Sequence, residues 1–346
     1  MTHSESRLAS GAIAIVIVAL VAFNVIAYPL GLFSLGQLLE GSTAAEWQKY
    51  VAGTAPDVLF LGDSRTRLDI QAPQFTAALS QLERRPIRVG RIGISSGRPE
   101  FFEAVAYRVM ALPVRPKAVV IGLSEWQFNA TYGVDFSSDY WQLSWPVDPG
   151  YLKFSYLLDG ETRRPGLTRD YLLPGLVDAH VMGEEARCLI LNPLPKTLLA
   201  KQAEWTGQTC QTAGDDVNSV MDDAMEKEIR DAYQGAHLNN YRVSQEELRH
   251  LSNVVARFRD AGIRVTFVNL PMYFIETINP AAYVLFNSAI NEFSNDLGVP
   301  FLDLHEEMRS NRADWRDPSH LTRSGALKWT PHFADVLVAA GAIPSI

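Results

Sequence analysis

The sequence has few cysteines, no basic run and no internal repeat. Its 346 residues include two cysteines, Cys188 and Cys210, which excludes a multi-disulfide scaffold and a cysteine-rich zinc site. Acidic residues outnumber basic ones by 39 to 31, and the net charge of -8 disfavours contact with phosphate backbones. Since no basic run carries interleaved aromatic residues, nucleic-acid binding is not expected. At 47% hydrophobic residues, the chain has enough apolar side chains for a packed core.

Charge is also missing from a long stretch near the N-terminus. Between Arg7 and Glu40 the only ionisable side chain is Tyr28, and residues 11–31 are aliphatic almost throughout. A helix needs about 20 such residues to cross a bilayer core. The sequence therefore predicts one transmembrane helix over 11–31, after a short flank at 1–10. A cleaved signal peptide is the alternative, but its apolar region is usually only about 7–15 residues long.

The charges beside this segment carry little information about its orientation. Arg7 precedes the segment, while acidic and basic residues both follow it. We expect the main domain to lie outside the cytoplasm, so that the chain is a single-pass protein of the inner (cytoplasmic) membrane with a periplasmic domain. In that compartment Cys188 and Cys210 can form a disulfide, and two buried free thiols are the alternative.

After a connector at 32–56, short apolar runs alternate with segments whose apolar residues have helical spacing. Strands are predicted at 57–63, 87–94, 118–123, 265–270 and 300–304, and helices at 69–82, 99–112, 244–261, 280–297 and 322–341. This alternation over 57–346 predicts an α/β domain with a doubly wound, flavodoxin-like, parallel five-stranded sheet. It breaks at about 129–241, which we interpret as one large insertion.

The first predicted strand ends in Gly62-Asp63-Ser64-Arg65. In sheets of this type, ligands lie outside the carboxyl ends of the strands. A serine at a tight strand-to-helix turn lies beside backbone N–H groups that have no helical partner and can stabilise an oxyanion. The alternative is that Asp63 or Ser64 only caps the next helix.

A second polar segment, Asp317-Pro318-Ser319-His320, precedes the last predicted helix. A carboxylate three residues before a histidine can reach the imidazole Nδ1 within one turn. That contact fixes the tautomer and leaves Nε2 free to take a proton from a serine hydroxyl. The alternative is a surface loop in which Asp317 caps the helix and His320 is solvated.

Taken together, the two segments resemble the SGNH/GDSL hydrolase superfamily, which carries a GDS block after its first strand and a DxxH block before its last helix. Here the blocks read FLGDSR and DPSHLTRSG. The resemblance implies that Ser64 is the nucleophile, that His320 is the general base and acid, and that Asp317 orients His320. It implies neither a cofactor nor a metal.

Two other blocks depart from the family pattern. The usual N-x-G-x-S-G reads RIGISSG here, which places Ser96 where the oxyanion glycine belongs and Gly97 beside it. The usual G-x-N reads Gly122-Leu123-Ser124, so a serine replaces the asparagine donor. The resemblance thus implies an oxyanion hole formed by the amides of Ser64 and of Ser96 or Gly97, with the Ser124 hydroxyl as a further donor. The alternatives are that another group such as Asn129 takes the place of the asparagine donor, or that the enzyme is slow with water.

The predicted membrane helix, the external domain and the segment Ser-Glu-Trp-Gln-Phe at 124–128 resemble one branch of the superfamily. That branch includes the D-alanine transfer protein of teichoic acid synthesis and the acetylation proteins of alginate-type polysaccharides. The resemblance implies a membrane-anchored serine O-acyltransferase or esterase that moves or removes an acetyl or D-alanyl group on an envelope polysaccharide through an acyl-serine. Its implied partner is a multispan membrane-bound O-acyltransferase. The alternatives are a non-catalytic assembly subunit that docks such a partner, and a lipase or thioesterase at the membrane surface.

Three further residues are candidates for substrate binding. Arg65 follows the nucleophile and suits an anionic group, although surface pairing fits equally. Trp126 lies in the segment at 124–128. Trp141 belongs to a group of aromatics in the insertion whose flat rings can stack on sugars, although packing of the insertion is their more usual role. The segment His305-Glu306-Glu307 lacks the HExxH spacing of a metal site, so we interpret it as a solvated helix start.

Overall fold

The computed structural model describes residues 50, 55–94, 97–132, 220–273, 279–307 and 311–343. The predicted transmembrane helix at 11–31 and most of the predicted insertion lie outside these residues, as do Ser96, Trp141 and both cysteines. Within the described ranges, no helix combines the length and apolar character that a membrane span requires.

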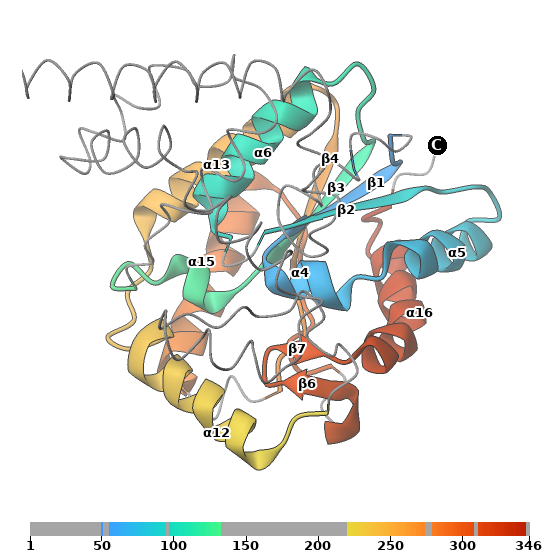
Figure 1. Ribbon diagram of the computed structural model, residues 1–346. Helices are drawn as coiled ribbons and strands as arrows, with labels where there is room; N and C mark the ends of the chain where they lie inside the picture. The colour runs from blue at the N-terminus through green and yellow to red at the C-terminus, as the bar shows by residue number, and fades with distance from the viewer. Residues whose placement is uncertain are drawn as a thin grey trace, which may run out of the picture. The chain divides into compact units, whose positions relative to one another are not determined.

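Five parallel strands form the central sheet (Figure 1). They are β1 (Val58–Gly62), β2 (Val89–Gly93), β3 (Ala118–Leu123), β4 (Arg264–Asn269) and β5 (Phe301–Asp303). Their order is β2-β1-β3-β4-β5, and every adjacent pair is parallel. This is the flavodoxin-like strand order, in which the chain reverses direction across the sheet after β2. The predicted five-stranded parallel α/β sheet is confirmed.

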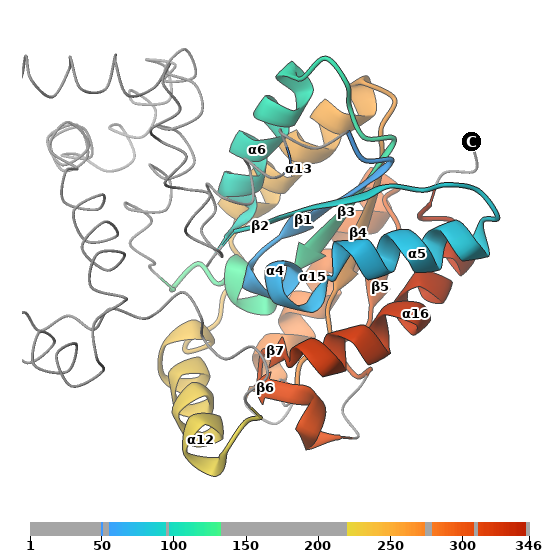
Figure 2. The same cartoon turned by 45° about the vertical axis from the view of Figure 1, so that its right-hand side comes forward.

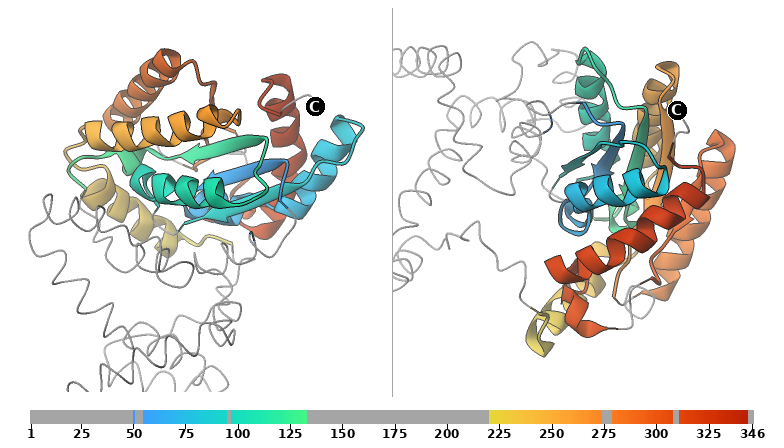
Figure 3. Two further views of the ribbon diagram at one scale, coloured as in Figure 1. Left: turned by 90° about the horizontal axis from the view of Figure 1, so that it is seen from above. Right: turned by 90° about the vertical axis from the view of Figure 1, so that its right-hand side faces the viewer.

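Helices cover the sheet in two groups (Figures 2 and 3). On one face, α6 (Pro99–Ala111) packs against α13 (Gln245–Asp260). On the other, α5 (Ala72–Leu82) packs against α16 (Arg323–Ala339). The α15 helix (Pro280–Leu297) packs against β5 and ends at Gly298, whose φ of +59° places it in the left-handed conformation that glycine tolerates.

Aromatic rings fill the core between the sheet and the α5–α16 pair. Phe60 of β1 lies 5.1 Å from Phe75 of α5 and 5.9 Å from Phe333 of α16, measured between ring centroids. All three side chains are buried. Side chains alternate between the two faces of a sheet along each strand. Phe267 of β4 lies on the opposite face from Phe60, where it stacks on Phe293 of α15.

The structure differs from the prediction just after β1. The helix expected at 69–82 begins at Ala72, as α5, and a helix that was not expected, α4 (Ser64–Asp69), lies between it and β1. Two residues in extended or irregular conformations separate the two helices. The α4 sequence SRTRLD has no apolar stripe, so hydrophobic spacing does not reveal it. The helix is instead capped by Asp63, whose Oδ1 accepts a hydrogen bond of 2.9 Å from the Arg65 amide.

Three further elements lie at the carboxyl edge of the sheet. A 3₁₀ helix (Glu125–Phe128) follows β3, and α12 (Asp223–Ala232) continues into a π-helical turn at Tyr233–His237. Strands β6 (Trp315–Asp317) and β7 (His320–Leu321) form a two-stranded antiparallel hairpin that the sequence pattern did not predict. Together with α4, they surround the residues singled out from the sequence.

Candidate active site

Ser64 is the first residue of α4, directly after the turn that leaves β1. The first N–H groups of a helix have no intrahelical partner, and the helix dipole places partial positive charge there. Ser64 as a whole is half-buried. Its position therefore combines an accessible oxygen with an amide suited to a developing negative charge.

The β6–β7 hairpin brings His320 to this hydroxyl. Nε2 of His320 lies 2.8 Å from Ser64 Oγ, although 256 residues separate them in sequence. Nδ1 of the same ring lies 2.8 Å from Asp317 Oδ2 and 3.0 Å from Oδ1. If Nδ1 carries the ring proton and donates it to Asp317, Nε2 is the acceptor for the Ser64 hydroxyl. The structure thus brings Ser64, His320 and Asp317 into one hydrogen-bonded chain.

The Asp317 carboxylate is held by its own turn. Its Oδ1 accepts hydrogen bonds of 2.8 Å from both the backbone amide and the hydroxyl of Ser319. This is the pattern in which an aspartate side chain closes a turn onto the amide two residues later. On the far side, the Pro318 carbonyl accepts a hydrogen bond of 2.8 Å from the Tyr273 amide, which ties the turn to the segment after β4.

The charges in this group support a basic imidazole. Burial alone would lower the pKa of His320, but the adjacent Asp317 carboxylate outweighs it and raises that pKa above the usual range. Burial opposes ionisation of Asp317 as well, yet His320 and the Ser319 hydrogen bonds lower the pKa of Asp317 to about 2. The pair is therefore arranged to favour an imidazolium beside a carboxylate, which is the state that proton transfer from Ser64 creates.

Arg65 has a different place from the one expected. It is 2% exposed, and its guanidinium donates to the carbonyls of Leu270 at 3.0 Å and Leu123 at 2.9 Å. Its Nε donates to Ser124 Oγ at 3.1 Å. These contacts join the turn after β1 to the ends of β3 and β4. The prediction that Arg65 binds substrate is therefore corrected: its donors are used by the protein, and it cross-links the sheet edge from within.

Ser124 is also engaged within this buried network. Its side chain is 0% exposed, its hydroxyl donates to Asp63 Oδ2, and it accepts from Arg65. A serine hydroxyl has one hydrogen, so Ser124 has none left for a substrate oxyanion in this arrangement. The interpretation of Ser124 as an oxyanion donor is corrected to that of a bridge between Asp63 and Arg65.

The predicted second oxyanion residue shows a similar engagement. The Gly97 amide donates to the Ile94 carbonyl at 3.0 Å, which closes the turn after β2. Gly97 is in turn held by Gln127, whose Nε2 donates to the Gly97 carbonyl at 2.8 Å and to Asp63 Oδ2 at 3.3 Å. Among the expected oxyanion donors in the described residues, Gly97 and Ser124 are engaged within the protein, and the Ser64 amide lies at the N-terminus of α4.

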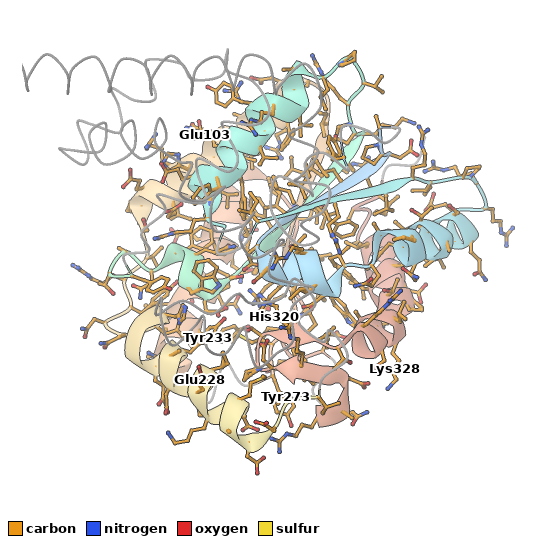
Figure 4. The ribbon with its side chains drawn as sticks, in the orientation of Figure 1. Glu103, Glu228, Tyr233, Tyr273, His320 and Lys328 are labelled. Atoms are coloured by element: carbon orange, nitrogen blue, oxygen red, sulfur yellow. The ribbon has the colours of Figure 1, made fainter. Side chains whose placement is uncertain are left out.

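Trp126 is 6% exposed and lies in an aromatic cluster. Its ring meets Tyr132 edge-on at 6.1 Å, and His237 lies 4.6 Å from Tyr132 and 4.7 Å from Tyr233. Trp126, which was expected to bind substrate, thus packs against Tyr132 within the protein. The Ser319 side chain is among the groups that lower the pKa of Tyr233, against the larger rise that burial causes. In Figure 4, Tyr233, Tyr273 and His320 lie on the same side of the sheet, beyond α4.

His305 is buried, contrary to the interpretation of its segment as a solvated helix start. Its Nδ1 lies 2.8 Å from Asp303 Oδ1 and also contacts the Tyr283 hydroxyl. Asn269 and Asn287 donate to the same Asp303 carboxylate at 3.0 and 2.8 Å. The cluster binds the ends of β4 and β5 to α15. Among the described residues, no three acidic, histidine or cysteine side chains are arranged to hold a metal ion.

Sequence reasoning missed Asp69, Gln127 and Tyr233. Each of them contacts the site through a partner far along the chain; the hydrogen bond from the Leu321 amide to Asp69, for example, spans 252 residues. The spacing of residues along a short stretch of sequence does not indicate a contact of this kind. The capping-box pattern of Ser124 and Gln127 is the one local signal available, and the structure forms that box.

Comparison with known proteins adds little to this geometry. No protein-family model and no curated protein sequence matches the chain. Among solved structures, a candidate acylhydrolase from Bacteroides fragilis NCTC 9343 matches with a TM-score of 0.39 and 13% identity, over 85% of this chain and 94% of that one. An acetyl xylan esterase matches with a TM-score of 0.38 and 10% identity, over 82% of this chain and 98% of that one. Likenesses of this size do not establish a family.

Proposed function

We propose that this protein is a serine esterase or O-acyltransferase that works through an acyl-serine at Ser64. The observation that carries the proposal is the hydrogen-bonded chain from Ser64 Oγ through His320 to Asp317, with contacts of 2.8 Å on either side of the imidazole. This is the arrangement that generates a nucleophile from a hydroxyl whose own pKa is far above neutral.

In the proposed first step, His320 Nε2 takes the Ser64 proton while Oγ attacks the acyl carbonyl. The Ser64 amide at the start of α4 donates to the oxygen that becomes negative. The imidazolium, stabilised by Asp317, then gives its proton to the departing alcohol oxygen as the carbon–oxygen bond breaks. In the second step His320 takes a proton from water or from an acceptor hydroxyl as that oxygen attacks the acyl carbon. The imidazolium then returns the proton to Ser64 Oγ as the bond between Oγ and the acyl carbon breaks, which releases the acid or the new ester.

Labelling by a fluorophosphonate probe tests this function. The full chain in mild detergent is expected to gain one probe adduct, located on Ser64 by peptide mass spectrometry. Ser64→Ala should lose it completely, whereas the control Ser252→Ala, a serine on α13, should keep it. An unlabelled wild-type chain, or a label that persists in Ser64→Ala, would contradict the proposal.

We further propose that the protein is anchored in the inner membrane by residues 11–31 and acts on an envelope polysaccharide beside a multispan O-acyltransferase. The uncharged N-terminal run supports the anchor, and retention of the protein in carbonate-washed membranes measures it. Loss of glycan acylation in cells with Ser64→Ala, together with normal protein level, is the result expected of the acyltransferase.

Because the Gly97 amide and the Ser124 hydroxyl are already engaged, we expect both acylation of Ser64 and its deacylation to be slow. Losing one well-placed oxyanion donor costs about 10²–10³ in rate in other enzymes. The same observation favours the second candidate, a non-catalytic docking subunit. Glycan acylation in cells separates the two, since a docking subunit keeps acylation in Ser64→Ala and the enzyme loses it.

A further inference from the structure

Asp69 is a buried carboxylate that neither the sequence pattern nor the proposed chemistry uses. It is the last residue of α4, the helix that begins with Ser64, and its side chain is 0% exposed. Its Oδ1 accepts a hydrogen bond of 2.9 Å from the backbone amide of Leu321. Leu321 directly follows His320 in β7. One hydrogen bond thus joins the helix of the nucleophile to the strand of the base.

This bond does something that the Asp317 contact does not. Asp317 and His320 are paired residues of the same hairpin, so their contact is kept if the hairpin moves as a unit. It orients the ring but does not set the distance from the ring to Ser64. The bond from Leu321 to Asp69 crosses from the hairpin to α4, the helix of six residues that begins at Ser64 and ends at Asp69.

The position of α4 is itself well defined. A Cβ atom on Gly93 of β2 would lie 2.4 Å from the Cβ and 2.6 Å from the backbone nitrogen of Arg67, so the helix rests directly on the sheet. Arg65 holds the same helix to the ends of β3 and β4. A hairpin tied to Asp69 is therefore tied to a fixed reference point.

We infer that Asp69 is a positioning residue, which keeps His320 within reach of Ser64 by holding the Leu321 amide against α4. The inference rests on the proposed function of Ser64 and His320. The part of Asp69 that acts is an oxygen acceptor, and a negative charge is not required. Burial raises the pKa of Asp69 to about 7, against His320, the Leu321 amide and Arg65, with Asp317 adding to the rise. Both the protonated and the ionised form retain an oxygen that accepts from Leu321.

Three variants of the full chain test the role. Asp69→Ala removes the acceptor, and Asp69→Asn keeps an oxygen at nearly the same place without the charge. Glu103→Gln is the matched control, because Glu103 is also a buried carboxyl with two side-chain hydrogen bonds, to His250 at 2.6 Å and Asn253 at 3.1 Å. It lies on α6, well away from His320 in Figure 4.

The measurements are the rate of fluorophosphonate labelling and the kcat and KM for p-nitrophenyl acetate, with Tm recorded for each variant. Asp69→Ala is expected to lower kcat and the labelling rate at least tenfold, with KM changed less than twofold. Asp69→Asn should stay within threefold of wild type, and Glu103→Gln within twofold even where its Tm falls. Should Asp69→Ala fail to fold, Asp69→Ser replaces it, since its shorter side chain falls short of Leu321 and should show the same loss.

Three outcomes overturn the inference. They are wild-type rates in Asp69→Ala or Asp69→Ser, equal losses in the alanine and asparagine variants, and a loss that follows Tm as closely in Glu103→Gln as in Asp69→Ala. A wild-type chain that takes no label on Ser64 overturns the proposed function and this inference with it. A labelled wild type with an unaffected Asp69→Ala overturns the inference alone.

Discussion

Replacing Arg65 with methionine distinguishes a structural role of this side chain from substrate binding. Methionine keeps most of the apolar stem and removes the guanidinium. In the native protein that group donates to Leu270 O, Leu123 O and Ser124 Oγ, and it lies 3.9 Å from Asp63 and 4.0 Å from Glu125. Its removal leaves these acceptors buried without their donor.

The expected magnitude follows from the burial of both partners. Asp63 and Glu125 are each 1% exposed, so a carboxylate that loses Arg65 cannot turn to water. Both oxygens of Glu125 lack a hydrogen-bond partner within the described part of the chain, and burial raises its pKa against the pull of Arg65. Breaking a buried ion pair by removing one partner typically costs about 3–5 kcal/mol. The contributions of the separate hydrogen bonds overlap with this figure and do not add to it.

We therefore expect Arg65→Met to lower the free energy of unfolding by about 3–5 kcal/mol. Urea denaturation of the full chain in mild detergent, followed by circular dichroism, measures this loss as a lower midpoint at equal slope. The control is Arg115→Met at an exposed position, where the change should stay within about 0.5 kcal/mol. A variant that unfolds like wild type, and whose KM rises for an anionic substrate alone, would refute the buried cross-link and restore the substrate-binding interpretation.

Two other predictions concern the protonation of His320 and the packing of α4 against β2. Because His320 must be neutral to take a proton, and Asp317 raises its pKa, kcat/KM should fall on the acid side of a midpoint above about 6.5, the usual histidine value. Asp317→Asn should move that midpoint to lower pH and slow turnover, by up to about 10⁴-fold as in serine proteases with this triad; an unmoved midpoint would contradict the pairing. Gly93→Ala should lower the free energy of unfolding by about 1–3 kcal/mol, because the added methyl meets the Arg67 backbone. It should also slow labelling of Ser64, and unchanged stability in urea would show that α4 is not seated on Gly93.

The bounds of strands and helices with a clear pattern of apolar residues could be predicted closely from the sequence. The strand at 118–123 and the helix at 280–297 have the expected bounds, since a fully apolar run and a proline start with a glycine stop are local signals. α4 was missed because its six residues carry no apolar stripe, and a capping aspartate and the fit against β2 define it instead. The β6–β7 hairpin was missed for a similar reason, because its strands have only three and two residues.

The same distinction between local signals and tertiary contacts applies to the roles of single polar residues. Ser64, Asp317 and His320 could be chosen from sequence because strand ends of one sheet meet at one edge, and a DxxH spacing closes within a single turn. Arg65 was predicted to bind substrate, and Ser124 and Gly97 to bind the oxyanion, because they too follow strands at this edge of the sheet. Whether a donor faces a substrate or a neighbouring carbonyl depends on residues brought in by other strands.

The order of apolar and polar residues along the chain was therefore sufficient to predict a parallel α/β sheet and the edge where its chemistry belongs, because both follow from local periodicity. Tertiary structure alone decided which hydrogen bonds are already made at that edge. The Arg65 guanidinium donates to the carbonyls of Leu123 and Leu270, and Asp69 accepts from the Leu321 amide. A buried donor or acceptor pairs with the polar group that the fold places within about 3 Å of it. Those neighbours come from segments 58 to 252 residues away in sequence.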